Sequence, residues 1–192
     1  MQDYLHSSSQ WHQFPLHQMA MPRRSGSVRF LPAPSQNHAH TNSIVTGASS
    51  GFGYATTLAA LQRGDKVVAT LRTPTQISDL EKKYDSKQLL ILKLDVTKPS
   101  EIESTFSQAI KHFGRIDVLL SNAGSSFVSE VEGTPDAKAR EIFEVLFWGA
   151  ANVTKEAVKC FKEQKPIGGK VLQVDSMVGV KGLPGLAYYS AA

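Results

Sequence analysis

Short apolar runs alternate with amphipathic segments from residue 42 almost to the last residue. The apolar runs have the length of β-strands and are rich in Val, Ile and Leu, and they span residues 42–46, 66–71, 89–94, 116–120 and 170–174. The amphipathic segments have the length of helices and span residues 52–63, 75–84, 100–113 and 136–163. Gly64 and Gly114 follow two of these segments, where a glycine commonly ends a helix.

The helical segments carry their apolar residues on one stripe. In 100–113 the stripe consists of Ile102, Phe106, Ala109, Ile110 and Phe113; in 136–163 it consists of Val153, Ala157, Val158 and Phe161. Strands and helices that alternate through short connections form right-handed βαβ units around a parallel sheet. The run 89–94 is almost entirely apolar, as expected for a strand covered on both faces. The pattern predicts an α/β fold, a doubly wound parallel sheet with helices on both faces.

The first forty residues show neither the hydrophobic period of a strand nor that of a helix. They hold five of the six histidines, four of the nine prolines and a single acidic residue, Asp3. We expect residues 1–40 to be a poorly ordered extension and residues 41–192 to be the folded domain. Three alternatives stay open: a transit peptide built on Arg23, Arg24 and Arg29, a metal site at His38 and His40, and a mis-assigned translation start. An apolar core typical of a secretory signal is absent from this stretch.

A glycine-rich loop joins the first predicted strand to the first predicted helix, in the order Thr-Gly-Ala-Ser-Ser-Gly-Phe-Gly over residues 46–53. Glycines at 47, 51 and 53 allow a tight turn and a close approach to a pyrophosphate. The helix that follows offers free N–H groups and a positive dipole end to the phosphates, and Ser49 and Ser50 add hydroxyl donors. An ordinary strand-to-helix turn is the alternative, but the strand, the helix and the place in the chain all favour nucleotide binding.

The spacing Thr-Gly-x-x-x-Gly-x-Gly resembles the short-chain dehydrogenase/reductase family. Later landmarks follow in the family's order: Asp95-Val96 after the third strand, Asn122-Ala123-Gly124 after the fourth, Ser176 and Gly179 after the fifth, and Tyr189 thirteen residues beyond Ser176. The match extends over residues 42–192 and excludes the first forty residues. The resemblance implies a Rossmann-like fold and a nicotinamide cofactor. It implies cofactor contacts at Gly47, Ser49, Ser50, Gly51, Phe52, Gly53, Asp95, Val96, Asn122, Ala123 and Gly124.

The resemblance also implies catalytic roles. Tyr189 would be the acid/base, with the adjacent Tyr188 as a rival, and Ser176 would orient the substrate oxygen. The expected reaction is hydride transfer between the cofactor and a small carbonyl or alcohol. A turn serine and a packing aromatic are the ordinary alternatives for these two residues.

The residue at the end of the second predicted strand helps to distinguish NADP from NAD as the cofactor. NAD-binding Rossmann units normally carry an acidic residue there to hold the ribose 2′-hydroxyl. This chain has Arg72 at that point, and its guanidinium suits a 2′-phosphate. We therefore place NADP ahead of NAD, with a solvated loop arginine as the alternative.

Three departures from the family pattern bear on activity. The asparagine position of the long helix holds Leu146, which cannot hold a relay water. Asp175 stands where a small residue or serine is commoner, and we expect a buried carboxylate there that would resist ionisation or repel the tyrosinate. The sequence ends at Ala192, one residue short of the family's lysine. We therefore expect a C-terminally truncated chain that lacks the last strands and helices, leaves its fifth strand with an open edge, and has little or no activity. A non-catalytic nucleotide-binding module or pseudoenzyme is the alternative.

Composition limits the remaining function classes. The formal net charge of +4 over 192 residues is mild and interspersed with acids, so nucleic-acid binding is not expected. The longest apolar stretch, residues 145–151, is far shorter than a membrane span. A single cysteine, Cys160, is consistent with a reducing, cytoplasmic compartment, with organellar targeting still open. We expect no metal site. The resemblance implies a homo-oligomer for intact family members, which we do not expect for this chain.

Overall fold

The computed structural model describes residues 40–192, and nearly all of the predicted extension lies outside the described residues. The strands are β1 (Asn42–Thr46), β2 (Lys66–Leu71), β3 (Leu89–Lys93), β4 (Val118–Ser121) and β5 (Lys170–Gln173). The helices are α1 (Gly51–Gln62), α2 (Pro99–Phe113), α3 (Asp136–Phe143), α4 (Ala150–Glu163) and α5 (Ala187–Ala191). Shorter helical segments are η2 (Pro74–Leu80), η3 (Glu144–Gly149) and η4 (Met177–Gly179).

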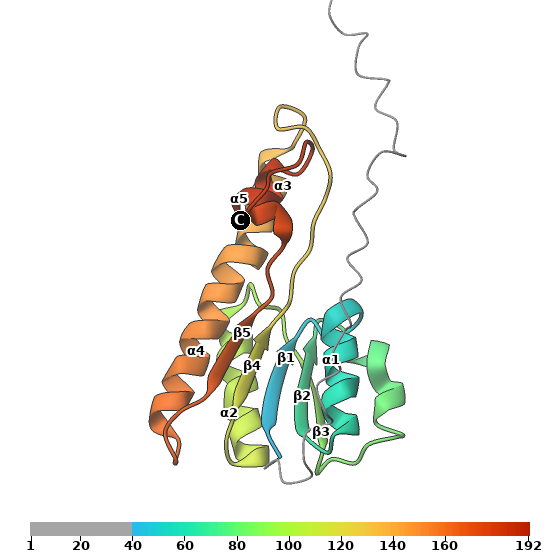
Figure 1. The fold of residues 1–192 in the computed structure, drawn as a ribbon, viewed down its shortest axis with the longest axis vertical. Helices are drawn as coiled ribbons and strands as arrows, with labels where there is room; N and C mark the ends of the chain where they lie inside the picture. The colour runs from blue at the N-terminus through green and yellow to red at the C-terminus, as the bar shows by residue number, and fades with distance from the viewer. Residues whose placement is uncertain (1–39) are drawn as a thin grey trace, which may run out of the picture. The chain divides into compact units, whose positions relative to one another are not determined.

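The five strands form one parallel sheet in the order β3-β2-β1-β4-β5. β1 lies at the centre of the sheet, β2 and β3 follow on one side of it, and the chain then crosses to β4 and β5 on the other side. Figure 1 shows α1 on one face of this sheet and α2 and α4 on the other. The predicted Rossmann-like, doubly wound α/β fold is confirmed.

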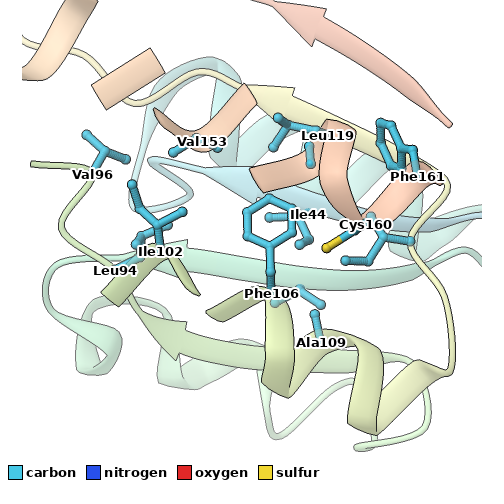
Figure 2. Close-up of a cluster of buried hydrophobic side chains, with 13 residues drawn as sticks. Ile44, Leu94, Val96, Ile102, Phe106, Ala109, Leu119, Val153, Cys160 and Phe161 are labelled. Carbon is cyan, nitrogen blue, oxygen red and sulfur yellow. The ribbon is translucent and has the colours of Figure 1, made fainter. Parts of the chain in front are cut away.

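Successive residues of each strand point to opposite faces of the sheet, and the two faces carry two separate hydrophobic cores. Ile44 of β1 belongs to the core beneath α2 and α4, where Phe106 is fully buried (Figure 2). The next residue, Val45, points to the other face and packs in the core under α1 and η2. Helices cover both faces of this sheet, so the strand residues that point to either face have to be apolar.

The predicted helix 75–84 is wrong in type and extent. The structure has a short 3₁₀ segment, η2, in which Ile77 leaves helical geometry at φ −124° and ψ 20°. Its two buried residues, Ile77 and Leu80, are three apart, which suits the three residues per turn of a 3₁₀ helix.

The predicted helix 136–163 is helical throughout but not regular. The π-helical segment η3 separates α3 from α4. The predicted apolar stripe of this helix was wrong at Val158, which is 39% exposed, and Cys160 takes its place. Cys160 lies seven residues after Val153 and three after Ala157, so it falls on the stripe that Val158 misses.

The carboxyl ends of the strands all lie at one edge of the sheet. The loop of residues 47–50, the segment after β4 and the segment after β5 begin at this edge, and α3 and α5 contact each other beyond it (Figure 1). In open α/β sheets, ligands bind outside the carboxyl ends of the strands, where the strand order reverses. Here the order reverses between β1 and β4.

Candidate functional site

The glycine loop is closely packed. Gly47 has φ +69° and Gly51 has φ +56°, in the left-handed region that favours glycine. Gly53 has a different reason to be glycine: a Cβ there would lie 2.3 Å from the carbonyl oxygen of Gly47. The loop can therefore turn tightly and keep its backbone open to a ligand.

The N-terminus of α1 is free to receive an anion. The hydroxyl of Ser50, the N-cap residue, makes no capping hydrogen bond, and the first turn of α1 contains no acidic side chain. The N–H groups of a first turn have no partner within their helix, and the helix dipole is positive there. This end of α1 is thus suited to a phosphate group.

A hydrogen-bond network ties the segment after β4 to the loop. The buried Oγ1 of Thr46 accepts hydrogen bonds from the backbone N–H groups of Asn122 and Ala123, both at 2.9 Å. In return, Nδ2 of Asn122 donates to the carbonyl oxygens of Thr46 at 2.9 Å and Gly47 at 3.3 Å. These bonds hold the segment after β4 and the glycine loop together as the two walls of a cleft.

A cavity of about 290 Å³ opens between these walls. Its lining includes every predicted cofactor contact except Gly51 and Gly53. The residues lining it are Gly47, Ser49, Ser50, Phe52, Leu71, Arg72, Leu94, Asp95, Val96, Asn122, Ala123, Gly124, Ser125, Glu141 and Val145. One cavity thus gathers residues from the ends of four strands.

Asp95 and Arg72 bring opposite charges to one part of this cavity. Burial opposes ionisation of Asp95. The hydrogen bonds that its carboxylate accepts from the Thr97 hydroxyl at 2.8 Å and the Thr97 backbone N–H at 3.0 Å, together with the charges of Lys98 and Arg72, outweigh burial and hold the pKa of Asp95 below its usual value. Arg72 is exposed and directly follows β2, with no acidic residue at the end of that strand.

A second cavity, of about 460 Å³, adjoins the first. The two share Asn122, Ala123 and Gly124. Ser176 and Tyr189 both line the second cavity, whereas Tyr188 is not among its lining residues. The structure therefore brings the two predicted catalytic residues to one cavity, next to the predicted cofactor cleft.

Each of the two residues has a local structural setting. Ser176 is the N-cap of η4, and its hydroxyl accepts a long hydrogen bond of 3.4 Å from the Val178 backbone N–H. Tyr189 lies half-buried on α5. The Ser176 hydroxyl is the acceptor in this bond, so its own hydrogen can still be donated to a substrate oxygen.

Leu146 and Asp175 line the same cavity. The side chain of Leu146 packs closely over Gly124, since a Cβ at Gly124 would lie 3.0 Å from Leu146 Cδ2. The sequence suggested a buried carboxylate at Asp175, and this was wrong: Asp175 is exposed, because it follows the end of an edge strand.

Within the part of the chain that the structure describes, β5 pairs only with β4. Leu172 of β5 is 52% exposed and the following Val174 is 39% exposed. The expected open edge beside apolar surface is therefore present among these residues.

Residues 40–192 contain no cluster of three or more His, Cys, Asp or Glu side chains placed to hold a metal ion. They contain no helix that is both long and apolar enough to cross a membrane. His38, half of the alternative metal site, lies outside the described residues.

Several residues of the site were not predicted from the sequence. Thr46 was noted only as part of the motif, although its hydroxyl joins the two walls of the cleft. Glu141 and Val145 also line the first cavity, from α3 and η3. A threonine at the end of a buried strand is a signal that could have found Thr46, whereas Glu141 and Val145 depend on where a helix lies in space.

Comparison with known proteins agrees with this geometry. The family model described as short chain dehydrogenase matches residues 41–192. An uncharacterised oxidoreductase of Schizosaccharomyces pombe is 36% identical over 149 residues, which are 78% of this chain and 49% of that protein. The chain spans about half the length of the curated relatives it matches.

Solved structures give the same result. A short-chain dehydrogenase from Streptomyces avermitilis has a TM-score of 0.74 and 34% identity, over 80% of this chain and 55% of that one. A 3-ketoacyl-(acyl-carrier-protein) reductase from Brucella melitensis, solved in complex with NADH, has a TM-score of 0.73 and 26% identity, over 79% of this chain and 63% of that one.

Proposed function

This chain belongs to the short-chain dehydrogenase family, and on that premise we propose that it is an NADP-dependent oxidoreductase for a small carbonyl or alcohol substrate, with low activity because Leu146 stands where the family has an asparagine. One observation carries the proposal: the cavity lined by the glycine loop and Arg72 adjoins the cavity lined by Ser176 and Tyr189. A cofactor in the first cavity would present its reactive end to a substrate in the second.

The residues of the first cavity fit a dinucleotide phosphate. The first turn of α1 and the serine hydroxyls would hold the pyrophosphate, and the backbone of Asn122–Gly124 would border the nicotinamide half. The bound cofactor supplies the hydride in reduction and accepts it in oxidation.

Arg72 favours NADP over NAD in this proposal. Its exposed guanidinium follows β2, where an NAD enzyme would carry an acid. Its positive charge contributes to the lowered pKa of Asp95, which lines the same cavity. A guanidinium pairs strongly with a phosphate but gains little from a ribose hydroxyl. The NADH bound to the Brucella relative belongs to that protein.

Ser176 and Tyr189, which line the second cavity, would position the substrate oxygen and provide its proton. In carbonyl reduction the Ser176 hydroxyl would donate a hydrogen bond to the carbonyl oxygen. Tyr189 would transfer its hydroxyl proton to that oxygen as the carbonyl carbon receives the hydride, giving an alcohol and a tyrosinate that solvent reprotonates. Leu146 leaves its side of the cavity apolar, so we expect reprotonation of Tyr189 to be slow.

The test pairs two neighbouring tyrosines. Under single-turnover conditions, with the protein in excess over NADPH and a panel of ketones and aldehydes present, NADPH oxidation is followed by absorbance. Tyr189→Phe should slow it about a hundredfold or more, whereas the control Tyr188→Phe should leave it nearly unchanged. Equal effects of the two variants would contradict the assignment, and NADPH binding without any oxidation would favour a non-catalytic nucleotide-binding module.

We place the protein in the cytoplasm as part of this proposal. The thiol of Cys160 is buried within the α2–α4 core, and burial raises its pKa. A lone buried thiol requires no oxidising compartment. Imaging of the full chain with a tag at its C-terminus would test this, and accumulation in an organelle would contradict it.

A further inference from the structure

A buried glycine lies inside the long helical stretch, close to the cofactor cavity. Gly149 is the last residue of the π-helical segment η3. Two other residues of η3, Val145 and Leu146, line the first and the second cavity respectively, whereas Gly149 is among the lining residues of neither. Segments of π-helix within longer helices are often found at functional sites. The part of the helix that carries Gly149 therefore borders both cavities.

The backbone conformation of Gly149 does not require a glycine. Its φ of −59° and ψ of −49° are ordinary helical values that any residue adopts. Inside a helix, glycine is less favourable than alanine, because it loses more conformational freedom on folding. The reason for a glycine at this position must therefore lie in the space around it.

A close approach of Val96 leaves no room for a side chain at position 149. A Cβ on Gly149 would lie 2.8 Å from Cγ2 and 3.1 Å from Cβ of Val96, and 3.2 Å from the carbonyl oxygen of Glu144. Val96 is buried at one end of the core beneath α2 and α4 (Figure 2), and it also lines the cofactor cavity. The side chain of Val96 thus connects Gly149 with the wall of that cavity.

Hydrogen bonds hold the backbone on either side of Val96. The N–H of Asp95 donates to Oε2 of Glu101 in the first turn of α2, at 2.8 Å. The N–H of Thr97 donates to Oδ1 of Asp95 at 3.0 Å. The side chain of Val96 is β-branched and has few rotamers, and the core beside it is close-packed. A Val96 side chain pushed away from the helix would therefore move toward the cavity.

We propose that Gly149 is a positioning residue of the cofactor cavity: without a side chain at 149, Val96 lies against the helix and leaves room for the adenosine half of NADP. Val96 follows Asp95, whose pKa responds to the charge of Arg72, so it belongs to the part of the cavity where we place the 2′-phosphate. This inference rests on the proposed function and adds a residue that acts through Val96 and touches neither cofactor nor substrate.

Gly149→Ala in the full chain tests the proposal. NADPH binding is measured by the fluorescence of the bound nicotinamide, and binding of 2′,5′-ADP, the adenosine half of NADP, by calorimetry. Both ligands should bind at least about fivefold more weakly, because the added methyl group displaces Val96 into the cavity. The midpoint of urea unfolding should change little, since the better helix propensity of alanine offsets part of the crowding.

Two further variants assign the effect to the contact with Val96. The control Gly182→Ala adds the same methyl group where a Cβ would meet nothing within 4 Å, and it should leave both affinities unchanged. Val96→Ala removes Cγ2, the atom nearest to the added methyl group. In that background, Gly149→Ala should change the affinity for NADPH by less than about twofold, because residues that act through one contact are not additive.

Failure of the inference can be told from failure of the proposed function. If the native chain does not bind NADPH, the proposed function fails and the inference fails with it. If the native chain binds NADPH and Gly149→Ala binds it equally well, or loses affinity for NADPH but not for 2′,5′-ADP, the positioning role is overturned. An equal loss in the Val96→Ala background would overturn it as well, and so would unfolding of Gly149→Ala in native buffer, because we expect the fold to persist.

Discussion

Replacing Thr46 by valine tests the network that holds the cleft together. Valine has nearly the same shape, but it cannot accept the hydrogen bonds that Oγ1 of Thr46 receives from the N–H groups of Asn122 and Ala123. A buried donor left without a partner costs about 1–3 kcal/mol. Both amides are partly buried, so the lower half of that range applies to each, and Thr46→Val should destabilise the fold by about 2–4 kcal/mol.

A second buried threonine provides the control. Thr70, on the adjacent strand, is as buried as Thr46, but its hydroxyl only donates one hydrogen bond, of 2.9 Å, to the carbonyl oxygen of Val45. Thr70→Val should therefore cost only about 1 kcal/mol. The assay is equilibrium unfolding in urea followed by circular dichroism. Equal destabilisation by the two substitutions would refute the reasoning that the acceptor role of Thr46 sets the larger cost.

Three further predictions concern single residues. Gly53→Ala places a methyl group 2.3 Å from the Gly47 carbonyl oxygen and should cost about 1–3 kcal/mol in urea unfolding and weaken NADPH binding in a fluorescence titration. The pKa of Asp95 is lowered in the folded protein, so its ionised carboxylate stabilises the fold above about pH 4, and this stabilisation is lost as the pH falls through the folded-state pKa. Asp95→Asn should therefore make the free energy of unfolding in urea less dependent on pH below about pH 5. Cys160, buried and with a raised pKa, should react with a disulfide reagent only when the chain unfolds, and rapid reaction in native buffer would contradict its burial.

The fold could be predicted from sequence where a hydrophobic pattern and a terminating residue agree. Helix α2 begins one residue before the predicted start and ends at Phe113 as predicted, because its apolar stripe and Gly114 both mark it. The segment after Pro74 shows the limit. Its two apolar residues satisfy a helix and a 3₁₀ turn equally, and tertiary packing of Ile77 and Leu80 decides between them.

In the candidate site, too, some residues could be predicted from the sequence and others could not. Motif residues such as Asn122 line the cavity where the family spacing placed them, since spacing along the chain fixes which strand end they follow. Arg72 also lines it, and it could be predicted because it follows the second strand, where an NAD-binding unit would carry an acid. The contribution of Glu141 was not predictable, because it depends on the path of the 125–135 segment and the placing of α3. The exposure of Asp175 was also mispredicted, because it depends on β5 lying at the edge of the described sheet.

The affinities of the chain for NADPH and NADH, measured side by side by the fluorescence of the bound nicotinamide, test the proposed NADP dependence directly. NADPH should bind at least about tenfold more tightly, because Arg72 pairs with the 2′-phosphate, and Arg72→Gln should remove the difference. Equal affinities in the native chain, or binding of neither cofactor, would contradict an NADP site in this cavity.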